Sequence, residues 1–250
     1  MSNKIGWCEK TWNPIIGCTK VSAGCKNCYA ERMGYRLAHI EMSTHGIQYH
    51  YANVIDWKTK GWNGTTHFVE SALEKPFHWK KSMIFVCSMG DLFHESIPFE
   101  MINSVFTIMS DCDWHIYQIL TKRPKRVLDF FTWKWLEIKK NTGQDIPWFP
   151  KDNIWFGVTV ENQENINRIA DLIKIPVKIH FISAEPLLSE IFIPDLQNIN
   201  WIISGEETGH KYRPMKIEWI ESLYEQCKAA NVPFFDKKNI LGLNIQQFPI

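Results

Sequence analysis

The sequence of 250 residues contains no long hydrophobic run and no marked excess of either charge. No window approaches the roughly 18 consecutive apolar residues that a membrane-spanning helix needs. The first residues, MSNKIGWCEKTWNP, lack the apolar core of a secretory signal peptide. These absences predict a cytoplasmic protein with no membrane partner. Lysine and arginine number 28 against 27 acidic residues, so any attraction for nucleic acid must come from a local basic groove.

Internal repeats and low-complexity tracts are also missing, which predicts one globular domain spanning residues 1–250. The hydrophobic fraction of 45% is sufficient for one sizeable core, and single α/β barrels often have about this length. Seven cysteines without a secretion signal argue against a disulfide framework. They favour metal binding or reactive thiols instead.

Short, nearly continuous apolar runs alternate with helical patterns along most of the chain. The runs cover residues 83–87, 116–120, 154–160, 177–183, 201–204 and 232–235, with one more near residues 12–17. The helical patterns cover residues 99–110, 124–136, 163–173 and 217–230. Such runs suit strands buried on both faces, and the alternation is typical of parallel βαβ units. We therefore expect an α/β fold, a parallel (β/α) barrel or partial barrel, with a loop-rich insertion at residues 40–75.

Polar side chains follow most of these runs at the same end. They are Asp91, Thr121, Lys122, Glu161, Glu185, Glu206, Glu207, Asp236 and Lys237. In barrels and open parallel sheets this end carries the functional site. Capping of the next helix is the alternative role for any one of them. The set as a whole predicts a site at the carboxyl ends of the strands.

Three cysteines, Cys18, Cys25 and Cys28, lie within eleven residues in a C-x6-C-x2-C pattern. A CxxC pair occurs both in zinc sites and in iron–sulfur loops. Three interpretations are therefore open: a closed zinc site with Cys8 as the fourth ligand, three buried thiols, or a 4Fe–4S cluster with one open iron. The loop directly follows the first expected strand, at the end where the polar residues gather, and this position favours the cluster.

The order of short motifs along the chain resembles that of an uncharacterised, often phage-encoded family of radical-S-adenosylmethionine-like proteins with a three-cysteine WNP–GC–GC–NCYAE signature. The motifs are WNP at 12–14, GC at 17–18 and 24–25, NCYAE at 27–31, SMGDLFHE at 88–95, QILTKRP at 118–124, WFGVTVE at 155–161, EPLL at 185–188 and RPM at 213–215. The resemblance implies a barrel of radical-S-adenosylmethionine type, in which Cys18, Cys25 and Cys28 bind a 4Fe–4S cluster. Their spacing differs from the C-x3-C-x2-C of most such enzymes.

The same resemblance implies S-adenosylmethionine as a second cofactor. Its candidate ligands are Tyr29, Ser88, Gly90, Asp91, Thr121, Lys122, Glu161 and Glu185. Asp91 would accept from the ammonium group of the cofactor and Glu161 from its ribose hydroxyls, while Lys122 would hold a carboxylate or a phosphate.

We thus expect an enzyme that receives electrons from an external one-electron reductant and generates a deoxyadenosyl radical. The resemblance does not supply a substrate, but the cationic run Thr121–Arg123 favours a nucleotide or a nucleic acid base. Candidates for substrate contact are His94, Glu206, Glu207, Arg213 and Lys237. Five tryptophans, Trp7, Trp12, Trp57, Trp62 and Trp79, could stack on a base, although core packing is the commoner role. The alternative function is a non-enzymatic, zinc-stabilised module that binds nucleic acid or protein.

Overall fold

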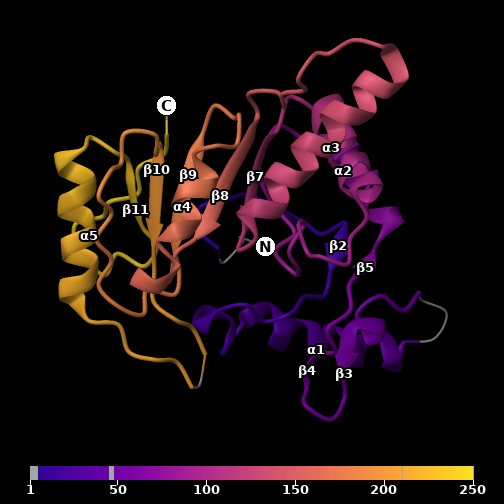
Figure 1. Ribbon diagram of the computed structural model, residues 1–250. Helices are drawn as coiled ribbons and strands as arrows, with labels where there is room; N and C mark the ends of the chain where they lie inside the picture. The colour runs from indigo at the N-terminus through magenta and orange to yellow at the C-terminus, as the bar shows by residue number, and fades with distance from the viewer. Residues whose placement is uncertain (1–4, 45–47, 210, 250) are drawn as a thin grey trace.

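Seven parallel strands form the main sheet of the computed structural model, which describes residues 5–44, 48–209 and 211–249. In spatial order they are β1 (Lys10–Trp12), β6 (Met83–Val86), β7 (Ile116–Thr121), β8 (Ile154–Thr159), β9 (His180–Ala184), β10 (Trp201–Ser204) and β11 (Phe234–Asp236). From β6 onward, each strand pairs with the next one along the chain. This order lets the sheet curl into a half-barrel (Figure 1). The expected α/β class and partial barrel are thus confirmed.

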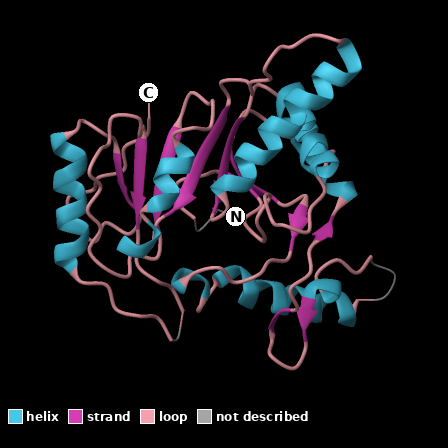
Figure 2. Ribbon diagram, in the orientation of Figure 1, coloured by secondary structure: helices cyan, strands magenta, loops and turns pink. Residues whose placement is uncertain are grey.

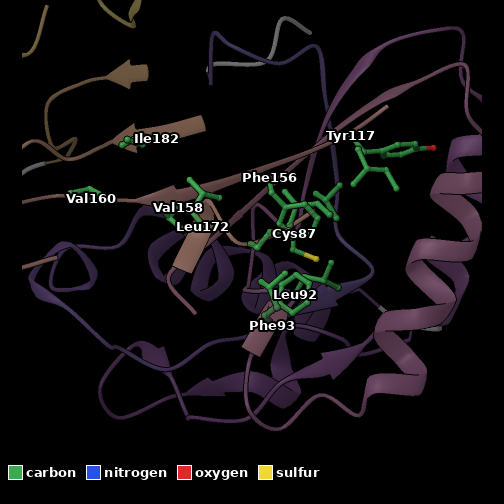
Figure 3. Close-up of a cluster of buried hydrophobic side chains, with 14 of the residues drawn as sticks. Cys87, Leu92, Phe93, Tyr117, Phe156, Val158, Val160, Leu172 and Ile182 are labelled. Atoms are coloured by element: carbon green, nitrogen blue, oxygen red, sulfur yellow. The ribbon is translucent and has the colours of Figure 1, made fainter. Parts of the chain in front are cut away.

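Four helices cover the outer face of this sheet (Figure 2). They are α2 (Phe99–Asp111), α3 (Pro124–Thr142), α4 (Asn167–Leu172) and α5 (Ile217–Ala229). Their buried side chains join those of alternate strand residues in one core cluster. Figure 3 shows part of this cluster, in which the rings of Phe93 and Phe156 lie 5.9 Å apart. None of the described helices is long and apolar enough to cross a membrane.

A second, mainly aromatic cluster fills the concave face of the half-barrel. Its largest members are Trp7, Phe85, Trp155, Phe181, Trp201 and Phe235. Trp7 comes from the segment before β1, and its ring centroid lies 4.7 Å from that of Phe85. A side chain at Gly157 would bring its Cβ within 2.3 Å of the Phe181 ring, so only glycine fits there. The interior of the half-barrel is therefore packed, and a site has to lie above it, at the ends of the strands.

The segment between the cysteine loop and β6 contains more regular structure than we expected. Helix α1 (Tyr29–Ser43), which we did not predict, lies across the ends to which the strand arrows point (Figure 1). The insertion then adds three short strands, β3 (Ile55–Asp56), β4 (Gly61–Trp62) and β5 (His67–Phe68). Short 3-10 helices lie in the same insertion at Ala52–Val54, Glu70–Ala72 and Lys75–His78, and others lie outside it at Ala23–Cys25 and Gln163–Asn165.

The strand predicted near residues 12–17 is two strands. β1 belongs to the main sheet, where Trp12 pairs with Val86 of β6. Pro14 interrupts the strand because it has no N–H group to donate. β2 (Ile15–Ile16) then leaves the sheet and pairs antiparallel with β5. The cysteine loop therefore begins between the main sheet and the insertion.

Candidate functional site

A cavity of about 200 Å³ lies at the carboxyl ends of the strands, beside the start of α1. Its walls bring together most of the residues that the sequence singled out. These are Cys18, Cys25, Cys28, Tyr29, Ser88, Gly90, Asp91, Thr121, Lys122, Glu185, Glu206, Glu207 and Lys237. The remaining three candidates, His94, Glu161 and Arg213, do not line the cavity. They contact residues that surround it.

The start of the cysteine loop is bound to the turn that follows β6. The side-chain oxygen of Asn13 accepts hydrogen bonds from Ser88 Oγ at 3.1 Å and from Met89 N at 3.0 Å. Gly17 N donates to Met89 O at 3.0 Å. A Cβ on Gly90 would lie 2.9 Å from Gly17 O, so the two backbones approach as closely as glycine allows. The WNP, GC and SMGD motifs thus form one structural unit.

The end of the loop and the first turn of α1 are bound to three other segments. Tyr29 Oη donates to Ser88 O at 2.8 Å, next to β6. Glu31 Oε1 accepts from Trp62 N at 3.1 Å, in the insertion. Asn27 Nδ2 donates to Glu207 Oε2 at 2.9 Å, in the segment that follows β10. The NCYAE motif therefore fixes the direction in which Cys28 enters the cavity.

Glu161 supports the middle of the loop. It is fully buried, and its Oε1 accepts hydrogen bonds from Ser22 Oγ and from Gly24 N, the latter at 3.1 Å. Its Oε2 accepts from Arg168 Nη1 at 2.7 Å. Burial raises the pKa of Glu161, but nearby Lys122 and Arg168 outweigh burial and hold it below the usual value. The structure therefore directs Glu161 at the loop backbone, whereas we had assigned it to a ribose in the cavity.

Asp91 lines the cavity, but its carboxylate is occupied by protein donors. Oδ1 accepts from Phe93 N at 3.0 Å and from Thr121 Oγ1 at 2.8 Å. Oδ2 accepts from Arg123 Nη1 at 2.9 Å and from Lys122 N at 3.3 Å. A carboxylate offers about four acceptor positions. The expected acceptance from a cofactor ammonium would therefore have to displace one of these bonds.

Arg123 connects this turn to the cysteine loop. Its Nε donates to both oxygens of Glu95 at 2.9 Å, and its Nη2 donates to Thr19 Oγ1 at 2.8 Å. Its Nη1 also lies 3.8 Å from Cys18 Sγ. His94 Nε2 contacts the same Thr19 hydroxyl at 2.9 Å. His94 is thus a partner of the loop and is not exposed to a substrate in the cavity.

The sulfur atoms of the loop lie among hydrogen-bond donors. Burial raises the pKa of Cys25, but the Lys122 ammonium and the backbone N–H groups of Val21 and Ser22 outweigh it and hold the pKa below its usual value. Burial raises the pKa of Cys18 to about 12 and also raises that of Cys28. Among the residues whose placement is described, no three His, Cys, Asp or Glu side chains gather around a single metal position.

Charged pairs form the opposite wall and the mouth of the cavity. Lys237 Nζ lies 2.7 Å from Glu185 Oε1, and Trp7 Nε1 donates to Glu185 Oε2 at 3.0 Å. Glu207 pairs with Arg213, which lies just outside the cavity wall. Glu206 lies 2.7 Å from Lys238 Nζ. The residues that we predicted for substrate contact at this end are therefore mostly engaged in these pairs.

The Glu207–Arg213 pair predicts a pH dependence of stability. Hydrogen bonds from Arg213 outweigh burial and lower the pKa of Glu207 from 4.5 to about 2. The ionised carboxylate therefore stabilises the folded chain above pH ~4.5, and this contribution is lost as the pH falls toward ~2. We expect Glu207→Gln to cost about 2 kcal/mol of unfolding free energy at pH 7. Urea unfolding should show the difference from the natural chain shrinking between pH ~4.5 and ~3. Glu206→Gln, at an exposed pair, is the control; an equal effect there would contradict this assignment.

Several cavity residues escaped the sequence analysis. Thr159 and Ser183 lie at or near the ends of β8 and β9 and face the cavity. Their signal was a small polar residue within an otherwise apolar strand. Trp7 and Trp62 also line the cavity, whereas Trp12 is fully buried elsewhere. Tryptophans alone give no sequence signal that separates these two locations.

Comparisons with known proteins give one match. The family model described as "Protein of unknown function (DUF5131)" matches residues 2–241. Neither the curated proteins nor the solved structures gave a match.

Proposed function

This chain belongs to the DUF5131 family of proteins of unknown function, and from this premise we propose that it is a radical-S-adenosylmethionine enzyme with a 4Fe–4S cluster. The observation that carries the proposal is the shared location of Cys18, Cys25 and Cys28. All three come from one short loop and line one cavity at the carboxyl ends of a parallel half-barrel. Functional sites of barrel enzymes occur at that end of the sheet.

The surroundings of the three sulfurs suit a cluster. Iron–sulfur clusters are held by thiolates, and hydrogen bonds to the sulfurs tune their reduction potential. Arg123 lies near Cys18 Sγ, Ser22 Oγ lies 3.8 Å from Cys25 Sγ, and the N–H groups of Ala30 and Glu31 face Cys28. When bound, such a cluster supplies the electron that splits S-adenosylmethionine into methionine and a deoxyadenosyl radical, which abstracts hydrogen from a substrate.

The residues of the chain divide into two groups in this proposal. Asp91, Thr121, Arg123 and Glu161 hold the loop and its neighbouring turn in place through the bonds described above. Lys122 is the cavity cation left to bind the carboxylate of the cofactor, because only its backbone N–H is engaged with Asp91. Tyr29, Ser88, Gly90 and Glu185 remain as further walls of the cofactor site. The aromatic cluster beneath keeps water away from the floor of the cavity.

The zinc-stabilised module is less well supported. It needs a fourth ligand, for which Cys8 was the candidate. Cys8 packs in the aromatic cluster of the half-barrel and does not line the cavity. A closed site with four sulfur ligands would have to draw it out of that cluster.

Anaerobic reconstitution tests the proposal. After treatment with iron and sulfide, the chain should be brown, absorb near roughly 400 nm and hold about four irons. Incubation with S-adenosylmethionine and dithionite, which stands in for the unknown external reductant, should then release deoxyadenosine. Cys25→Ala should lose both the iron and the deoxyadenosine, while Cys8→Ala should retain them. A colourless protein with one zinc, dependent on Cys8, would contradict the proposal.

The substrate is best sought among nucleotides and nucleic acid bases. Trp62 and Tyr29 on the wall would give a base an aromatic contact. Hydrogen abstraction can be tested by incorporation of deuterium from a labelled nucleotide into deoxyadenosine.

A further inference from the structure

Three aromatic rings gather on the outer side of α1 and on the hairpin formed by β3 and β4. On α1, the rings of Tyr35 and His39 lie 4.3 Å apart. The Trp57 ring, in the hairpin turn, lies 5.9 Å from Tyr35 and 5.1 Å from His39. Trp57 belongs to neither core cluster, and 42% of it is exposed. The tryptophan is therefore held by neighbouring rings while part of its indole surface remains open to a ligand.

One cation, Lys60, lies over these rings, and two more, Arg36 and Lys58, are neighbours of the ring residues in the sequence. Arg36 follows Tyr35 on the helix, and Lys60 Nζ lies 5.9 Å from the Tyr35 ring centroid. Within the described ranges, no carboxylate lies at ion-pair distance from Arg36, Lys58 or Lys60. The one acidic side chain of the hairpin, Asp56, accepts from the N–H groups of Lys58 and Thr59.

The local charge contrasts with that of the whole chain. Residues 20–66 hold six lysines and arginines against three acidic residues, whereas the complete chain has a net charge of only +1. Of these acidic residues, Glu41 is buried and Glu31 pairs with Lys20. Arg36, Lys58 and Lys60 thus outnumber Asp56 in the hairpin and the adjoining part of α1.

Lys60 adopts a backbone conformation that favours glycine. Its φ is +61°, in the left-handed region, and its N–H closes the hairpin turn by donating to Asp56 O at 2.8 Å. A side chain in this region carries a conformational penalty that glycine avoids. Closing the turn does not require lysine, and the contact of its ammonium with the Tyr35 ring is the one role within the described fold that a glycine would lose.

We propose that Tyr35, His39 and Trp57, together with Arg36, Lys58 and Lys60, form a surface that binds single-stranded nucleic acid. An unpaired base stacks on Trp57, and the adjacent phosphates lie against the cations. Aromatic platforms flanked by lysine and arginine bind single strands in this way, with little dependence on sequence. A paired base could not offer its face to the ring, so the geometry favours a single strand over a duplex.

The position of this surface connects it to the cavity. The β3–β4 hairpin extends outward beside α1 (Figure 1). Trp62, which ends β4, lines the cavity, and a Cβ on Gly34 of α1 would lie 2.4 Å from its ring. A strand bound at Trp57 therefore lies on the same hairpin as the cavity wall. Any reaction of a bound base depends on the proposed radical enzyme, whereas binding of the strand to this surface does not.

Fluorescence anisotropy of the full-length chain with a labelled oligothymidylate and an oligouridylate, each of about 20 nucleotides, tests the proposal. We expect Trp57→Ala to weaken binding about 10-fold, because each stacked base contributes appreciably to affinity. Lys60→Gly should weaken binding and lower the slope of log K against log salt by roughly 0.7. Its unfolding midpoint in urea should not fall, since glycine suits the backbone there. This variant therefore separates binding from folding.

Matched controls exclude general effects. Trp114, 41% exposed in the connection between α2 and β7, is as accessible as Trp57 but lies outside the surface formed by α1 and the hairpin. Trp114→Ala should bind the oligonucleotides like the natural chain. Cys25→Ala should do the same, which would show that binding does not need the cluster. Equal affinity of Trp57→Ala and the natural chain would overturn the proposal, as would an equal loss in Trp114→Ala. Binding of a duplex as tight as that of the single strand would overturn it too. So would tight binding of polyglutamate that does not depend on Trp57, which would point to an acidic protein partner.

Discussion

Replacing Arg123 with methionine should lower the free energy of unfolding by about 3–5 kcal/mol, because it leaves a buried carboxylate without its cation. The side chains of Arg123 and Asp91 are only 5% and 8% exposed, and the guanidinium joins Asp91, Glu95 and Thr19. Methionine fills the space of the aliphatic stem but donates no hydrogen bond. Asp91 and Glu95 then repel each other without a bridging charge.

Urea unfolding followed by circular dichroism measures this loss. Lys139→Met removes a cation from an exposed pair with Asp145, and it should change stability by less than about 1 kcal/mol. Adding Asp91→Asn to Arg123→Met should recover part of the loss, since it removes the unpaired charge. A loss below about 1 kcal/mol in Arg123→Met would show that water reaches this network and that the pair is not buried.

Glu161→Gln should also destabilise the chain by about 3–5 kcal/mol, and it should loosen the cysteine loop. The glutamine cannot accept from Ser22, Gly24 and Arg168 at once, because one of its two terminal groups is a donor. The single amide oxygen would stay with Arg168 Nη1, a buried cation that also donates to Thr159 O at 2.7 Å, and the NH2 group would face the Ser22 and Gly24 donors. The lost hydrogen bonds therefore fall on the loop.

Two measurements separate these effects. Urea unfolding gives the global loss, and the rate of trypsin cleavage at the exposed Lys26 reports local opening of the loop. Glu164→Gln, on an exposed side chain three residues further along, is the matched control and should change neither. If Glu161→Gln lowered stability without faster cleavage at Lys26, Glu161 would support the strand ends alone and not the loop.

The main sheet was predictable because burial on both faces leaves a strong pattern. In runs such as 154–160, the residues that face a helix or the barrel interior are apolar. The observed strand β8 (Ile154–Thr159) lies within that range. Helix α1 was not predicted, because contacts with other segments decide which residues occupy it and weaken its helical sequence pattern. Gly34 lies in its middle, where Trp62 requires the space, and a glycine weakens a helical pattern. The separate pairing of β2 was missed because its partner, β5, lies about fifty residues away in a segment with little pattern of its own.

The site was predictable in its composition but not in the contacts of each residue. The ends of parallel strands meet at one edge, and this rule was enough to bring Cys18, Lys122 and Glu185 to one cavity. It could not distinguish a carboxylate that faces the cavity from one that faces the loop. Glu161 and Glu185 both follow their strands within two residues, yet Arg168 and Gly24 bind the former outside the cavity.

The anchoring of the cysteine loop at both ends bears on how the chain would take up iron. In zinc fingers, metal binding and folding are one event, because the ligands are not gathered beforehand. Here the bonds of Asn13, Tyr29 and Glu161 close the loop through protein contacts alone. The entropy of that closure is lost when the polypeptide folds, so it does not weaken the later affinity for metal. A loop closed in this way would keep its shape whether or not a metal centre is bound, so loss or rebuilding of such a centre would not require the chain to unfold.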